Sequence, residues 1–139
     1  YLSELNVPGK PNRTNLGECA AIQRFLSTHP NENLAILTPY RNQRALLAGT
    51  AKKSSYPQEV SLTVHRAQGR VWDTVLFSIV DATGKFFTTT LNPQNCGTQI
   101  INTAVSRAKN RLILVCDCND WGEQPKKLIG QLLQVAQSI

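Results

Sequence analysis

The sequence predicts an α/β fold in which helices cover both faces of a mainly parallel sheet. Three apolar runs, at residues 34–37, 74–80 and 112–115, lack the polar alternation of a half-exposed strand. Such runs are typical of strands that are buried on both faces. Segments with the apolar spacing of helices lie between them, and strands that alternate with helices favour a parallel sheet.

The first helix is the best-marked element. Residues 1–15 hold two prolines and a glycine, which predict a lead-in strand and a loop. Asn15 suits a helix N-cap, and Glu18 three residues later comes close to a capping box. Apolar residues from 20 to 26 give the helix one buried side, and residues 29–31 end it.

The next elements follow the same order of strand and helix. A strand at 34–37 leads into a second helix, where Pro39 suits the first turn. Polar residues at 48–58 predict a loop, and the alternation at 60–64 predicts a third strand segment.

The second half of the chain predicts a buried strand at 74–80 and a loop at 86–97. A helix is expected at 98–109, a buried strand at 112–115 and an amphipathic C-terminal helix at 128–135. No internal repeat interrupts this order, so we expect residues 1–139 to form a single domain.

The chain is basic, with 15 Lys and Arg against nine Asp and Glu, for a net charge of +6. This surplus favours a polyanionic partner such as nucleic acid or nucleotide. The basic residues are scattered, so a solvated basic surface is the alternative. The four cysteines lack the spacing of a zinc site, so we expect no metal ligands and reduced thiols in an intracellular protein.

The first residue and the hydropathy of the sequence indicate whether the chain is a fragment and whether it associates with a membrane. The sequence starts at Tyr1 and contains no Met, so we expect a piece of a longer polypeptide or a processed product. No apolar stretch approaches the roughly 20 residues that span a bilayer, and no signal peptide pattern is present. We therefore expect no membrane association.

Polar stretches rich in Gly, Gln, Ser and Arg adjoin the predicted strands, at residues 38–43, 63–73 and 102–109. Ligands of open parallel sheets sit beyond the carboxyl ends of the strands, and fixed guanidinium groups suit phosphates. No Walker A loop is present, and no acid pair or His/Cys cluster of catalytic type occurs. The residues alone therefore predict a phosphate-binding α/β domain.

Three segments resemble motifs IV, V and VI of superfamily 1 helicases, in the branch of the nonsense-mediated-decay RNA helicase and RecD-like DNA helicases. They read Thr-Pro-Tyr-Arg-Asn-Gln at 38–43, Thr-Val-His-Arg-Ala-Gln-Gly-Arg at 63–70 and Asn-Thr-Ala-Val-Ser-Arg-Ala-Lys at 102–109. The resemblance covers residues 15–117. It implies a second, C-terminal RecA-like domain without its own P-loop, with a first domain that holds Walker A and Walker B before Tyr1.

The resemblance also implies roles for single residues. Tyr40 would pack on adenine, and Arg41 and Arg107 would be catalytic arginine fingers at the γ-phosphate. Further nucleotide contacts would come from Gln43, Gln68, Gly69 and Arg70. Thr63 and His65 would contact the nucleic-acid backbone. Asn15 and Glu18 resemble an Asn-x-x-Glu element that precedes motif IV.

The resemblance implies partners as well. ATP and Mg²⁺ would be bound mainly by the missing first RecA-like domain, so this fragment alone should not hydrolyse ATP. Single-stranded DNA or RNA would bind, and phosphate contacts do not tell the two apart. The full protein would be an ATP-dependent helicase. The alternatives are a degenerate, non-catalytic module that binds nucleic acid or protein, and an unrelated phosphate-binding domain.

Each assigned residue also has a structural alternative. Tyr40 could be a packing residue, Arg41 a solvated helix residue, Arg107 a partner of a local carboxylate and His65 a structural histidine. Trp72 is expected in the core. One departure from the family stands out: the usual pattern Gln-Gly-x-Glu has Val71 in place of Glu. Because valine accepts no hydrogen bond, the expected contact to the nucleotide sugar is missing.

Overall fold

A five-stranded parallel sheet forms the centre of the computed structural model, in the order β1-β5-β4-β2-β3. Every strand pair is parallel. The structure describes residues 2–3, 14–80, 96–116, 132 and 134–136. The strands are β1 (Leu2–Ser3), β2 (Leu34–Thr38), β3 (Ser61–Thr63), β4 (Trp72–Ser78) and β5 (Ala108–Cys116). The predicted fold class, a parallel sheet with helices on both faces, is confirmed.

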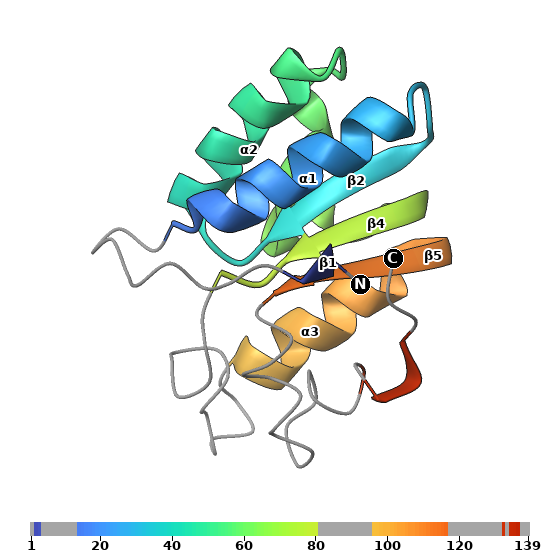
Figure 1. Cartoon of the computed structure of the whole chain (residues 1–139). Coiled ribbons are helices and arrows are strands. Elements are labelled where there is room, and N and C mark those ends of the chain that lie inside the picture. The colour runs from blue at the N-terminus through green and yellow to red at the C-terminus, as the bar shows by residue number, and fades with distance from the viewer. Residues whose placement is uncertain (1, 4–13, 81–95, 117–131, 133, 137–139) are drawn as a thin grey trace.

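Helices cover the two faces of the sheet unequally (Figure 1). Helices α1 (Leu16–Thr28) and α2 (Arg41–Lys53) lie side by side over one face. Helix α3 (Cys96–Ser106) and the short 3-10 helix η2 (Val64–Ala67) lie on the other face. A second 3-10 turn, η1 (Gln58–Val60), leads into β3.

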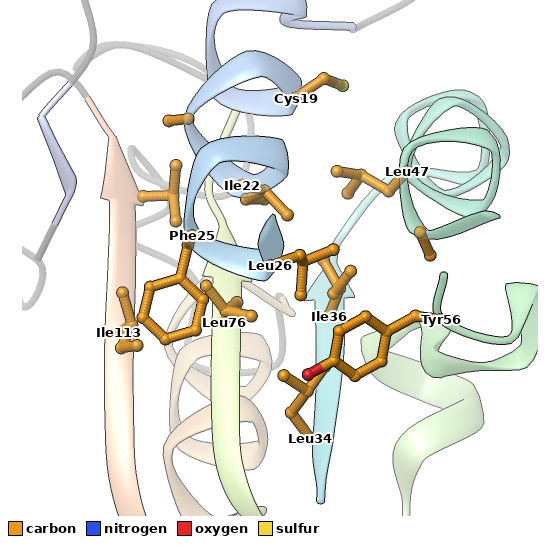
Figure 2. Packing of buried hydrophobic residues seen from close by; sticks show 13 residues of the cluster. Cys19, Ile22, Phe25, Leu26, Leu34, Ile36, Leu47, Tyr56, Leu76 and Ile113 are labelled. Carbon is orange, nitrogen blue, oxygen red and sulfur yellow. The ribbon is translucent and has the colours of Figure 1, made fainter. Parts of the chain in front are cut away.

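The strands alternate their side chains between two hydrophobic clusters, one on each face. On β2, Leu34 and Ile36 pack toward α1 and α2, whereas Ala35 and Leu37 pack toward α3. Figure 2 shows the first cluster, where Phe25 of α1 lies against the strands. Burial of each large apolar side chain stabilises the fold by about 1.5–3 kcal/mol. Burial on both faces explains why the strands have no polar alternation in the sequence.

Helix α1 begins as predicted. Asn15 is its N-cap, and its Oδ1 accepts a hydrogen bond from the Glu18 backbone N–H at 3.1 Å. In return, Asn15 Nδ2 donates to Glu18 Oε2 at 3.2 Å. The pair satisfies one orphan N–H of the first turn.

Helix α2 is longer than the sequence pattern predicts. Residues 48–53, expected in a loop, continue the helix to Lys53. Ala48 and Ala51 are buried and extend the apolar side set by Leu47, so tertiary packing sustains the last turn and a half. The loop that follows buries Tyr56, whose hydroxyl contacts the His29 carbonyl.

The boundary between α3 and β5 also differs from the expectation. Helix α3 starts at Cys96 and ends at Ser106, and β5 begins at Ala108 rather than 112. The start of β5 pairs with Trp72 through a register shift, and its residues 109–111 are exposed. The sequence pattern missed the first half of β5 because its residues are polar. They are polar because this half of the strand extends beyond the apolar centre of the sheet. The loop expected at 86–97 lies outside the described residues except for its last two, which belong to α3. The helix expected at 128–135 lies largely outside the described residues.

Strand direction gives the sheet two distinct edges. The carboxyl edge is where β2 ends at Thr38, β3 at Thr63 and β4 at Ser78; the amino edge is where β4 begins at Trp72 and β5 at Ala108. Helix α2 begins at the carboxyl edge and α3 ends at the amino edge (Figure 1). Among the described residues, no helix combines the length and apolar character that crossing a membrane requires.

Candidate nucleotide and nucleic-acid interface

The turn from η2 into β4 places two predicted nucleotide contacts at the amino edge. Gly69 has a φ of 78°, a left-handed conformation that glycine adopts without strain. An added Cβ would meet nothing within 4 Å, so the backbone angle, not crowding, favours glycine here. The Arg70 guanidinium lies over the Trp72 ring, 4.8 Å from its centroid. This cation–π contact holds the charge at the surface.

Arg107 lies in the tight link between α3 and β5, at the same edge. Its carbonyl accepts a hydrogen bond from the Trp72 N–H at 2.9 Å, and its N–H donates to the Ala104 carbonyl at 3.2 Å. The guanidinium donates from Nε and Nη2 to Ser106 Oγ, at 3.2 and 3.0 Å. Within the described part of the chain no carboxylate pairs with it, so its charge is available.

The carboxyl edge carries the other predicted contacts. Tyr40 is the N-cap residue of α2 and packs, half-buried, against the α3-side cluster. Arg41 is exposed in the first turn. Thr63 ends β3 with only 8% of its surface exposed, whereas His65 in η2 is exposed.

The structure separates Arg41 from Arg107. Arg41 follows the carboxyl end of β2, and Arg107 precedes the amino end of β5. Strand β4, which lies between β2 and β5, has seven residues and therefore spans about 20 Å. The domain thus does not bring together the two guanidinium groups that the resemblance places at one γ-phosphate.

Gln43 has a structural position that the resemblance does not suggest. Its side chain is fully buried. Its Oε1 accepts from the Asn15 N–H at 2.9 Å, and its Nε2 donates to the Asn15 carbonyl and to Ser78 Oγ, both at 3.1 Å. Because both ends of the amide are engaged inside the protein, Gln43 has no exposed atom for a nucleotide.

Glu18 is the centre of this buried network. It is 1% exposed, and its Oε1 accepts from Ser78 Oγ at 2.7 Å. Both carboxylate oxygens accept from the Val80 N–H, at 2.9 and 3.1 Å, and Asn15 Nδ2 donates to the Val80 carbonyl at 3.4 Å. Val80 has a φ of 69°, a strained conformation for a β-branched residue. The network therefore holds the strained end of β4 against α1.

Sequence reasoning missed the burial of Glu18 and the part played by Ser78 and Val80. One feature of the sequence could have indicated this burial: Glu18 is an acidic residue in the first turn, on the otherwise apolar face of the helix. A carboxylate at a helix N-terminus is normally explained by capping and the helix dipole alone. Only the fold shows that the same carboxylate faces the end of β4.

Burial also changes the chemistry of Cys19, which lies beside Gln43. Desolvation raises the pKa of the Cys19 thiol to about 11, and the charge of Glu18 raises it as well. At neutral pH the thiol is protonated and unreactive, because the thiolate is the nucleophile.

A pocket of about 280 Å³ lies between η2 and α3. It brings His65 and Gln68, which were predicted for different ligands, into one site with the polar side of α3. Beyond Gln68 the chain continues through Arg70 to Val71 at the amino edge. The Val71 side chain is 48% exposed there. In the described residues, no group of three or more His, Cys, Asp or Glu is placed to hold a metal ion.

Comparison with known families decides what kind of domain this is. The model of a family described as AAA domain matches residues 7–119, most of the chain. The chain belongs to this family. Its members are the helicase-like C-terminal domains of superfamily 1 helicases. No curated protein matches the chain.

We expect Glu18→Gln to lower the free energy of unfolding by about 1–3 kcal/mol. The amide NH₂ cannot accept from Val80 N–H or Ser78 Oγ, so it leaves a buried donor unsatisfied. The matched control is Glu32→Gln, which removes the half-exposed ion pair to Arg111 at 2.8 Å and should cost under about 1 kcal/mol. Urea unfolding of both variants measures the difference; equal losses would contradict a special role for Glu18.

The raised pKa of Cys19 predicts a loss of stability at alkaline pH. The folded-state pKa of about 11 lies above the model value of 9.0. Deprotonation therefore favours the unfolded chain, so stability falls as pH rises from 9 toward 11. The measurement is the free energy of unfolding against pH for the parent and Cys19→Ala. Their difference should shrink across this range, and a constant difference would rule the coupling out.

Proposed function

We propose that this chain is the second RecA-like domain of an ATP-dependent superfamily 1 helicase, of the branch that includes the nonsense-mediated-decay RNA helicase and RecD-like DNA helicases. The observation that carries the proposal is the amino edge, where the Arg70 guanidinium lies over the Trp72 ring and the Arg107 carbonyl accepts a hydrogen bond from the Trp72 N–H. Gly69 forms the turn that precedes them. Two guanidinium groups without carboxylate partners among the described residues suit a polyphosphate.

In this proposal ATP sits between this amino edge and a first RecA-like domain that supplies the Walker motifs and Mg²⁺. The γ-phosphoryl group gains negative charge on its equatorial oxygens as it transfers, and an arginine stabilises that charge. Arg107 takes this role. Its two bonds to Ser106 Oγ orient the guanidinium before the nucleotide arrives, which lowers the ordering cost of binding.

Single-stranded nucleic acid binds at the carboxyl edge, near Thr63 and His65. The segment from Thr63 to Trp72 runs from the carboxyl end of β3 to the amino start of β4, across the α3 face. One continuous piece of backbone thus joins the nucleic-acid side to the nucleotide side. Its residues Val64 and Ala67 are buried in the α3-side cluster and anchor the segment between the two edges.

A second candidate function is a non-catalytic helicase-like binding module. The observation that favours it is Val71, whose exposed side chain stands where the family usually has a carboxylate near the nucleotide sugar. A weakened nucleotide site would leave the nucleic-acid edge as the working surface.

In the complete protein we expect Arg107→Ala to lower kcat for ATP hydrolysis by about 10³-fold or more, as loss of an arginine finger does. Arg41→Ala, at the opposite edge, should have a much smaller effect. Steady-state phosphate release in the presence of single strands is the measurement. If Arg107→Ala retains the parental rate, the proposed nucleotide site is wrong; if Arg41→Ala is the inactive variant, the nucleotide lies at the carboxyl edge.

Val71→Glu tests the choice between motor and binding module. A carboxylate that accepts from a ribose hydroxyl contributes about 1.5–3 kcal/mol, or roughly ten- to a hundredfold in affinity. We expect tighter binding of an ATP analogue by calorimetry, with Val71→Gln as the uncharged control. Equal or weaker binding in the Glu variant, together with no ATPase activity in the parent protein, would favour the module.

A further inference from the structure

The pocket between η2 and α3 has the construction of a ligand site. Its floor is apolar and buried: Val64 is 2% exposed and Ile100 is 6% exposed. Its rim carries the polar side chains of His65, Gln68, Gln99 and Asn102. An apolar floor with a few converging polar groups is the usual composition of small-molecule sites.

The polar rim of this pocket is free to bind. Gln68, Gln99, Asn102 and His65 are exposed, and their side chains make no hydrogen bond within the part of the chain that the structure describes. Each amide offers both donors and acceptors, and the imidazole adds a flat ring. Gln99 and Asn102 lie three residues apart on α3, so they project from the same side of the helix.

These groups match the chemistry of a nucleobase. The edges of bases carry adjacent donors and acceptors, which Asn and Gln amides pair with, and unstacked bases of single strands stack on His rings. The volume of about 280 Å³ lies just below the range of sites for drug-sized ligands, which suits one ring system and not a whole nucleotide. Among the described residues that line it there is no Asp, Glu, Lys or Arg, so the lining suits a base better than a phosphate.

The place of the pocket selects the source of the base. It opens directly after Thr63, where the proposed strand path crosses the carboxyl edge. Arg107, the proposed phosphate contact, follows the C-terminal end of α3, beyond the pocket residue Thr103. We infer that the pocket receives one unstacked base of the bound single strand. The inference rests on the proposed function, because it needs a strand at this edge.

A base pocket would give the domain a sequence preference, which phosphate contacts do not provide. Contacts to the backbone position a strand without regard to its bases, whereas contacts to base edges carry sequence preference. Since Val64 and Gln68 belong to the segment that leads to Gly69, an inserted base would also contact the piece of chain that joins the two edges. The strand would then be sensed through a base as well as through its phosphates.

The test compares two fluorescent single strands of equal length in the complete protein, one with bases and one in which every base is replaced by an abasic sugar. Both ribose and deoxyribose forms are used, with mixed base composition. The parent should bind the strand with bases more tightly, and His65→Ala and Asn102→Leu should remove about tenfold of that preference. The salt slope of Asn102→Leu should stay the same as that of the parent, because Asn102 is not a proposed phosphate contact.

Asn102→Leu keeps the size of the side chain and removes its hydrogen bonds. The matched control is Gln23→Ala, an exposed amide of α1 on the opposite face, which should keep the parental preference. Thermal unfolding of each variant establishes that it is folded.

The outcomes separate this inference from the proposed function. If neither strand binds, the proposed nucleic-acid edge fails. If both strands bind and the variants lose affinity for both equally, or for neither, the base pocket is overturned while the edge stands. If the variants instead weaken an ATP analogue and leave both strands unaffected, the pocket takes the base of the nucleotide and the inference is wrong.

Discussion

The arrangement of this domain depends on one buried carboxylate. Glu18 lies in the first turn of α1 and accepts hydrogen bonds from Ser78 and Val80 at the end of β4, while Asn15 connects it to Gln43 of α2. Three elements distant in sequence therefore meet at one charge. Loss of one partner of a buried charge is far more costly than formation of the whole group is favourable. Through its hydrogen bonds to the Val80 N–H, the carboxylate also keeps Val80 in a backbone conformation that valine otherwise avoids.

With the sheet fixed in this way, the family motifs divide between its two edges. Tyr40, Arg41 and Thr63 lie at the carboxyl edge, and Gly69, Arg70 and Arg107 at the amino edge. An isolated α/β domain usually has one ligand edge, at the carboxyl ends of its strands. In the proposed function the domain works between a nucleic-acid strand and a nucleotide, and the closely packed, doubly covered sheet is the rigid body between these two surfaces. The segment from Thr63 to Trp72 joins the two edges covalently.

Much of the fold could be predicted from the sequence. Strands that are buried on both faces appear as apolar runs, and Asn15 is a residue type that is preferred at helix N-caps. The errors have physical causes. The last turns of α2 are held by packing of Ala48 and Ala51, which local propensity does not register. The first half of β5 is polar because it extends past the core. For the site, motif order does not show which edge of the sheet each residue occupies. Arg41 follows a strand and Arg107 precedes one, and strand direction places them at opposite edges. The motif predicts a ligand contact for Gln43, whereas the structure shows its side chain in two hydrogen bonds to the Asn15 backbone.

Val71 has a consequence for its neighbour that the family pattern alone does not suggest. A carboxylate next to Arg70 would compete for its guanidinium, and a partly exposed pair of this kind typically contributes less than about 1 kcal/mol while it neutralises the charge. With valine in that position, the Arg70 guanidinium lies over the Trp72 ring, 4.8 Å from its centroid, and pairs with no carboxylate among the described residues. A ring restrains the direction of the side chain and leaves its positive charge and its donors available. Valine at this position therefore leaves a second charged donor at the edge where Arg107 is already held by Ser106. In the proposed function, this exchange favours contacts from the two guanidinium groups to the phosphates of the nucleotide over a contact from residue 71 to its sugar.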